Sequence, residues 1–94
     1  MSACVVGHIT VKDADKWEQY RQQVPSTLEP WRAEVVLRGS RAVVLAGEHH
    51  HTDTVVLRFP DKEAVQKWYD SPAYQALIPL REQAAEVLLV SYDE

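Results

Sequence analysis

The segment "DTVVLRFPDKEAVQKWYD", Asp53 to Asp70, contains the pattern that decides the fold. Its first part, "DTVVLRF", is rich in β-branched residues and is typical of a strand. Asp61 then stands where a helix N-cap is expected. The apolar residues after it recur at helical spacing and form one stripe: Ala64, Val65, Trp68 and Tyr69. The segment therefore predicts a strand that leads directly into an amphipathic helix.

The N-terminal part of the chain has the same order of strand and helix. "ACVVGHITV", Ala3 to Val11, predicts a strand, and Asp13 predicts the N-cap of a helix. Apolar residues near helical spacing follow it: Ala14, Trp17, Tyr20, Val24 and Leu28. Pro25 should interrupt or kink this helix, because proline has no backbone N–H to donate. Ser26 and Glu29 have capping-box spacing, so a second short helical piece is expected to begin there.

The middle of the chain contains several short β-type runs. "AEVVLRG", residues 33–39, predicts a strand that ends at the Gly39-Ser40 pair. "RAVVLAG", residues 41–47, is either a third short strand or the same strand after a bend. Residues 48–52 have the length of a hairpin loop that leads into the strand at 53–59.

The C-terminal part completes the element order. Ser71-Pro72 reads as an N-cap followed by proline at the first helical position, and Pro79 should break or kink that helix. "EVLLVSY", Glu86 to Tyr92, is the last predicted strand. The order strand, helix, strands, helix, strand is a split βαβ pattern. We therefore expect one ferredoxin-like α+β domain over residues 1–94, with an antiparallel sheet and helices on one face.

Alternation divides the strands between two faces of the sheet. One predicted face is uniformly apolar, as a face under helices should be: Val5, Gly7, Ile9, Val35, Leu37, Val55, Leu57 and Phe59. The other mixes valines with polar and charged residues: Cys4, Val6, His8, Thr10, Glu34, Val36, Arg38, Thr54, Val56 and Arg58. The helices suffice for one face, and the second has too many valines to be left bare. We therefore expect a homodimer in which two sheets face each other.

Composition and charge exclude several classes of protein. The chain has 94 residues, of which 46% are hydrophobic, and a formal net charge of -4. Because no basic surplus could neutralise phosphates, we expect neither a nucleic-acid partner nor an anionic-membrane partner. The single cysteine, Cys4, cannot form an internal disulfide, and the N-terminus lacks a signal-peptide pattern. The apolar runs are too short to span a bilayer, so a soluble cytoplasmic protein is expected.

Several segments resemble a known family. "KWYDSPAYQALIPLREQAAEVLLV" is similar to the signature of the bacterial domain-of-unknown-function family 1330 (DUF1330), and "VPSTLEPW", "VVLRGS" and "VVLRFPDKEAVQKWYDSP" are similar to its other blocks. The resemblance covers nearly the whole chain and implies a subunit of the dimeric α+β barrel superfamily. It implies no settled activity. Other members of that superfamily include cofactor-free monooxygenases, haem-degrading enzymes and lactone isomerases.

The chain also departs from the pattern of that family. Trp31-Arg32-Ala33 stands where the family usually has Tyr-Gly-Gly, and Arg58 stands where an acidic residue is usual. His8 lies near a position that is commonly acidic. Other positions match the family pattern: Arg38, Gly39, Asp70, Ser71, Tyr74 and Arg81.

The run His49-His50-His51 is either a metal site or a turn. In an extended chain His49 and His51 point to one side, and such a pair can hold two corners of a zinc or copper site. Glu48 or Asp53 could add a third ligand. However, no Cys or His pair elsewhere completes a known spacing, and the family has no histidine cluster at this place. We therefore expect a solvated hairpin loop, no functional metal and no cofactor.

Three residues of the mixed face are the main candidates for a site. Alternation places His8, Arg38 and Arg58 on one side of the sheet, and the hypothesis is that they converge on one polar pocket. Two arginines would bind the carboxylate or enolate of a small anionic ligand. His8 would be the catalytic acid or base, because it titrates near neutral pH. Arg81 and Tyr74 would contribute from the helical segment.

Two functional interpretations fit this pattern. In the first, the protein binds or transforms a small organic acid in a cleft of the dimeric barrel by cofactor-free acid/base chemistry. In the second, Glu34 and the arginines form an ion-pair network across the dimer interface. The protein is then a non-catalytic interaction or stress-related dimer.

Overall fold

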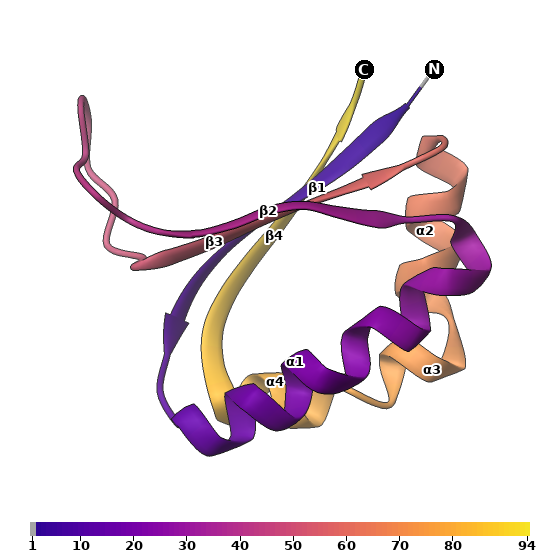
Figure 1. Cartoon of the computed structure of the whole chain (residues 1–94), viewed down its shortest axis with the longest axis horizontal. Helices are drawn as coiled ribbons and strands as arrows, with labels where there is room; N and C mark the ends of the chain where they lie inside the picture. Colours follow the sequence, from indigo (N-terminus) through magenta and orange to yellow (C-terminus); the bar gives the residue numbers. More distant parts are fainter. Residues whose placement is uncertain (1) are drawn as a thin grey trace.

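The computed structural model describes residues 2–94 and shows a four-stranded antiparallel sheet with the helices on one face (Figure 1). The strands are β1 (Ala3–Val11), β2 (Glu34–Ser40), β3 (Asp53–Phe59) and β4 (Ala85–Asp93). The helices are α1 (Ala14–Leu28), α2 (Lys62–Asp70), α3 (Pro72–Gln75) and α4 (Ile78–Ala84), and a short 3-10 helix, η1 (Glu29–Trp31), follows α1. The strand order β2-β3-β1-β4 is that of a ferredoxin-like sandwich, which confirms the predicted fold class.

Three side chains cap helices at the positions that the sequence predicted. Each accepts a hydrogen bond from the backbone N–H three residues later: Asp13 from Lys16 (3.1 Å), Asp61 from Ala64 (2.7 Å) and Ser71 from Tyr74 (3.3 Å). These bonds satisfy backbone donors that a helix start otherwise leaves without partners. The chain therefore turns sharply at the end of β1 and of β3, and α1 and α2 fold back over the sheet.

Helix α1 continues through Pro25, so the predicted interruption is wrong. The hydroxyl of Ser26 donates to the carbonyl of Gln23 (3.0 Å) instead of capping a second helix. Buried residues lie on both sides of the proline, among them Val24 and Leu28. Their packing against the sheet holds the helix together where the backbone hydrogen bond of the proline is missing.

The core lies between the helices and the face of the sheet that they cover. Trp68, Tyr74 and Phe59 are its largest fully buried side chains. The indole N–H of Trp68 donates to the hydroxyl of Thr27 (3.0 Å), which ties α2 to the end of α1. Among residues 2–94, no helix is long and apolar enough to cross a membrane.

A β-bulge in β2 changes the predicted faces of that strand. Val35 and Leu37 lie opposite consecutive residues of β3, so Val36 is an extra residue. Beyond a bulge, each side chain points to the side opposite to the one that simple alternation predicts. Arg38 therefore lies on the helix side of the sheet and Leu37 on the other side, which corrects the assignment made from the sequence.

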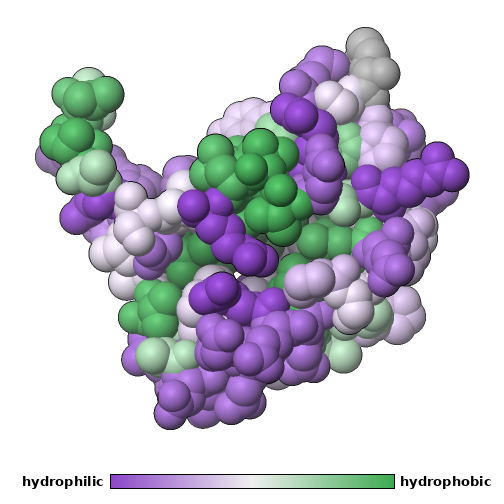
Figure 2. All heavy atoms as spheres, viewed as in Figure 1, coloured by the Kyte–Doolittle hydropathy of each residue, from purple (hydrophilic) through white to green (hydrophobic). Residues whose placement is uncertain are grey.

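Residues 41–52 form an arm that projects beyond the sheet (Figure 1). The predicted third strand at residues 41–47 is therefore wrong, and the predicted loop at 48–52 is the returning half of the arm. The backbone N–H of Arg41 donates to the carbonyl of Thr52 (2.7 Å), which closes the base of the arm. The arm carries the exposed side chains of Val43 (67%) and Leu45 (93%), and its apolar tip is visible at the upper left of Figure 2.

The face of the sheet away from the helices, called here the open face, is largely apolar. Val6, Val56 and Val90 are half-buried at neighbouring positions of the three strands β1, β3 and β4. Three larger apolar side chains around them are exposed: Leu37, Leu88 and Tyr92. A single chain therefore leaves a broad apolar surface in contact with water.

Candidate functional site

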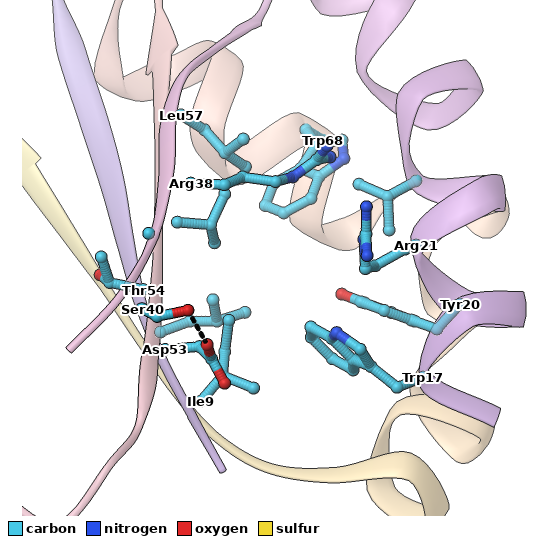
Figure 3. A pocket seen from close by; sticks show the side chains of 14 residues that line it. Ile9, Trp17, Tyr20, Arg21, Arg38, Ser40, Asp53, Thr54, Leu57 and Trp68 are labelled. Atoms are coloured by element: carbon cyan, nitrogen blue, oxygen red, sulfur yellow. Dashed lines mark hydrogen bonds between the residues drawn. The ribbon is translucent and has the colours of Figure 1, made fainter. Parts of the chain in front are cut away.

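A cleft of about 370 Å³ lies between the helix side of the sheet and helix α1 (Figure 3). Its walls are mostly apolar and aromatic. Trp17 and Tyr20 come from α1, Trp68 from α2, and Val55 and Leu57 from β3. Cavities of this size and character are typical of small-molecule sites.

Two arginines reach into this cleft from opposite sides. Arg38 extends from β2 toward Trp68, and Arg21 extends from α1 above Tyr20 (Figure 3). Arg21 also pairs with Glu18 of the same helix (3.2 Å), whereas Arg38 is an exposed residue of β2 whose side chain lines the cleft. The bulge at Val36 is the local cause, because without it Arg38 would point to the open face.

The other end of the cleft holds a carboxylate. Asp53, at the start of β3, accepts hydrogen bonds from the hydroxyls of Ser40 (3.2 Å) and Thr52 (2.9 Å). Figure 3 shows it at the opposite end from Arg38, below Ser40 and beside Ile9. The cleft therefore offers cationic donors at one end, an anionic acceptor at the other, and aromatic surface between them.

A buried chain of hydrogen bonds supports the aromatic wall. The hydroxyl of Tyr20 is 2.8 Å from that of Tyr74, and Arg81 donates to the Tyr74 oxygen (3.0 Å). Burial, and then the neighbouring Tyr74, raise the pKa of Tyr20 far above that of a free phenol, outweighing Arg81, which lowers it. Tyr20 therefore stays neutral at physiological pH and serves as a wall of the cleft and not as a base.

The residues proposed from the sequence do not converge on one pocket. His8 lies on the open face, Arg38 lies in the cleft on the opposite side of the sheet, and Arg58 is half-exposed with Glu94 3.9 Å away. Tyr74 and Arg81 are buried behind Tyr20 and outside the cleft. The hypothesis of a single site is therefore wrong within one chain. The bulge separates Arg38 from the other two residues, and His8 and Arg58 lie four positions apart along the sheet, since Arg58 pairs with Cys4 and His8 with Thr54.

The cleft also contains residues that the sequence did not point to as site residues. Trp17, Tyr20 and Trp68 fit a helical apolar stripe, and such a stripe predicts a core just as well as a pocket. Arg21 and Asp53 belong to no sequence motif that would mark them as site residues. Their convergence depends on the distance between α1 and β3, which only the three-dimensional structure supplies.

His8 has instead become part of a histidine cluster on the open face. Its ring centroid is 4.8 Å from that of His49 and 6.4 Å from that of His51. Desolvation, and then the nearby His8 and His51, lower the pKa of His49 below that of a free imidazole. His49 is therefore mostly neutral at pH 7.

Comparison with known proteins now gives the family. The family model described as "Domain of unknown function (DUF1330)" matches residues 2–93. This chain belongs to the DUF1330 family. The match confirms the resemblance that the Trp-Tyr-Asp-Ser-Pro block indicated. No curated protein matches the chain significantly.

Solved structures with the same fold extend this result. A protein of unknown function from Rhodopseudomonas palustris, RPA0582, superposes with a TM-score of 0.83 at 15% identity, covering 99% of this chain and 82% of that one. SnoaB, a cofactor-independent oxygenase from Streptomyces nogalater, has a TM-score of 0.68 at 10% identity, covering 99% and 92%. A dimeric ferredoxin-like protein of unknown function from Thermobifida fusca has a TM-score of 0.66 at 15% identity, covering 100% and 92%. These likenesses confirm the ferredoxin-like fold.

Proposed function

We propose that this DUF1330 protein binds a small organic acid with a planar, apolar body in the cleft between the sheet and α1. The observation that carries the proposal is the guanidinium of Arg38, which lies in a cavity walled largely by aromatic and aliphatic side chains. A guanidinium offers two parallel N–H donors to a carboxylate, and aromatic faces favour a planar ligand. The polar groups are few, so they would set the orientation of the ligand and the apolar walls would supply most of the affinity.

The distribution of charge makes the proposal more specific. Arg38 and Arg21 favour one anionic group at their end of the cleft, whereas Asp53 at the other end would repel a second one. The carboxylate of Asp53 would accept a hydrogen bond from a ligand hydroxyl or enol. The ligand class is therefore a monoanionic acid with a hydroxyl at the far end of its ring system.

Cofactor-free acid/base chemistry is the transformation that these groups would support. Asp53 is the base that the cleft itself supplies, and Arg38 would stabilise negative charge that develops on a ligand oxygen. His8 lies on the other side of the sheet, so the acid/base role moves from His8 to Asp53. SnoaB, which has the same fold, is described as a cofactor-independent oxygenase, and this supports chemistry without a bound cofactor.

We also propose a homodimer in which two open faces pack together. The apolar surface around Val6, Val56 and Val90 would be removed from water, and a neighbour of the same fold is described as dimeric. Cys4 is a free cysteine on this face, which is compatible with a reducing compartment, and we propose the cytoplasm. If the cleft binds no acid, this dimer is itself the second candidate function, a non-catalytic interaction or stress-related protein.

Ligand binding to the cleft can be tested with one matched pair of probes. Naphthalene-2-carboxylate carries the anionic group, and naphthalene-2-carboxamide has the same shape without the charge. Calorimetry should show that the wild-type chain binds the carboxylate at least about tenfold more tightly than the amide, a difference of about 1.4 kcal/mol. Arg38→Gln should abolish this preference, because the fork of donors is lost.

Arg58→Gln is the matched control for Arg38→Gln. It removes the same charge from the neighbouring strand at a half-exposed position outside the cleft. The control should keep the preference for the carboxylate. Equal affinity of the wild type for both probes, or an equal loss in both variants, would show that Arg38 recognises no acid in the cleft.

A further inference from the structure

All four histidines of the chain lie together at one end of the sheet, although His8 is far from the others in sequence. His8 comes from β1, and His49, His50 and His51 come from the returning half of the arm. Neighbouring ring centroids are 4.1 Å apart for His50 and His51, and 5.5 Å apart for His49 and His51. Imidazoles are among the commonest protein ligands of zinc and copper.

A carboxylate completes this group. Glu86 lies at the start of β4, opposite Thr10 of β1, and its Oε1 is 3.1 Å from Nε2 of His50. One ligand atom from each of His50, His51 and Glu86 lies within 4.8 Å of the other two. We propose that His50, His51 and Glu86 bind a divalent transition-metal ion of the Zn²⁺ class, with water in the fourth position.

The geometry is close to what such an ion requires. Zinc bonds to nitrogen and oxygen ligands of about 2.0–2.2 Å place tetrahedral ligand atoms roughly 3.3–3.6 Å apart. The contact between His50 and Glu86, 3.1 Å, is slightly shorter than this range, and the longest separation must shorten by roughly 1.5 Å at most. Both side chains are exposed, 69% and 59%, so they can move inward without disturbing the core.

The third ligand is held firmly. His51 is buried, and its Nδ1 is 3.0 Å from the hydroxyl of Thr10. When Nδ1 donates to that hydroxyl, Nε2 carries the free lone pair that a metal needs, and metal-binding histidines generally have such a partner on the second nitrogen. The backbone N–H of Thr52 donates to the carbonyl of Ile9 (3.0 Å), which ties this end of the arm to β1.

Arg41 is the charge that opposes cation binding at this place. Its guanidinium, however, donates to the carbonyls of His49 (2.8 Å) and His51 (3.3 Å), so it is engaged by the arm backbone. One carboxylate and two imidazoles would leave a bound divalent ion with one uncompensated positive charge, which a bound hydroxide or an anionic ligand would neutralise. A water in the fourth position makes this an open site and not a closed structural one.

The metal proposal and the cleft proposal are independent. The histidine group lies on the open face and at the arm, whereas Arg38 and Asp53 lie on the helix side. The sequence alone predicted no functional metal, because no Cys or His pair elsewhere in it completes a known metal-site spacing. Pairing of β4 with β1 supplies Glu86 from outside the run.

Zinc binding by the full chain, produced without a histidine tag, is the test. After treatment with EDTA and dialysis, calorimetry with ZnCl₂ should give one ion per chain. His50→Ala and Glu86→Gln should each weaken binding by at least about tenfold, since each removes one of three ligands, and both replaced side chains are exposed. Co²⁺ in place of Zn²⁺ should give the strong visible absorption of a four-coordinate ion.

His49→Ala is the matched control, because His49 is a neighbour in the same run but lies outside the proposed ligand set. It should retain the wild-type affinity within about threefold, and circular dichroism and urea unfolding should show that every variant folds. A binding stoichiometry below one would overturn the proposal. So would an equal loss in all variants, because this would mean that the run binds zinc only as an unstructured histidine tract.

Discussion

The hydroxyl of Tyr74 is predicted to be the most important single polar atom of the core. It is fully buried and has two partners, the hydroxyl of Tyr20 at 2.8 Å and the guanidinium of Arg81 at 3.0 Å. Tyr74→Phe keeps the ring and removes only this oxygen. Arg81 would then keep Glu82 (3.2 Å) as a partner for its other nitrogen, but the nitrogen that faced Tyr74 would stay buried without an acceptor.

The expected loss can be worked from these two bonds. A hydrogen bond to a charged group contributes about 1.5–3 kcal/mol and a neutral one about 0.5–1.5 kcal/mol, so both together amount to roughly 2–4.5 kcal/mol. The remaining pair with Glu82 favours the lower half of this range. Urea unfolding at a fixed protein concentration should therefore show a free energy of unfolding lowered by about 2–3 kcal/mol with an unchanged m-value. For a domain of this size the midpoint of thermal unfolding should fall by roughly 10 °C or more.

Two variants decide whether the reasoning holds. Tyr20→Phe removes the neutral bond alone and should cost about 1 kcal/mol. Ser26→Ala removes a hydroxyl from the exposed side of α1, away from the open face, and should change the free energy of unfolding by less than about 0.5 kcal/mol. The control defines a change that is too small to matter. If Tyr74→Phe also changes the free energy of unfolding by less than about 0.5 kcal/mol, the buried hydrogen-bond chain does not stabilise the fold and the argument is refuted.

The other predictions concern the core and the assembly. Thr27→Val leaves the buried N–H of Trp68 without its acceptor and should lower the free energy of unfolding by about 1–3 kcal/mol, whereas Thr27→Ser, which keeps the hydroxyl, should cost clearly less in the same urea titration. Light scattering of the wild-type chain should give twice the chain mass of 10.7 kDa, and Leu88→Lys on the open face should shift it toward a single chain, because the new charge would be buried between the sheets. Gln19→Lys, on the exposed side of α1, should leave the mass unchanged, and a wild-type chain that is monomeric at micromolar concentration would contradict the proposed dimer.

Much of the fold could be predicted because the strong signals are local. Alternation in β1 and β3 separates a buried side from an open side, and the caps at Asp13 and Asp61 mark where the helices begin. The interruption predicted at Pro25 was wrong because the packing of Val24 and Leu28, on both sides of the proline, outweighs the missing backbone hydrogen bond. Propensity is a weak signal wherever tertiary contacts oppose it.

The sites were less predictable for physical reasons that differ between them. The run Val35-Val36-Leu37 is apolar at every position, so its sequence carries no mark of which residue is extra. The side on which Arg38 lies was therefore misassigned, and with it the pocket. At the histidine run the ligand types were recognised, but Glu86 approaches them only because β4 pairs with β1.

Because Val36 is an extra residue in β2, counting along the sequence no longer gives the side of the sheet on which a later side chain lies. If β2 paired without the bulge and kept every residue, simple alternation would carry the guanidinium of Arg38 across the sheet, from the cleft to the open face. Deleting Val36 would instead leave Leu37 opposite Val56 and Arg38 opposite Val55, so the guanidinium would stay on the cleft side. When relatives are aligned column by column, an arginine in this column therefore lies on the cleft side in chains that carry the bulge or lack the extra residue, and on the open face in chains that keep the residue without the bulge.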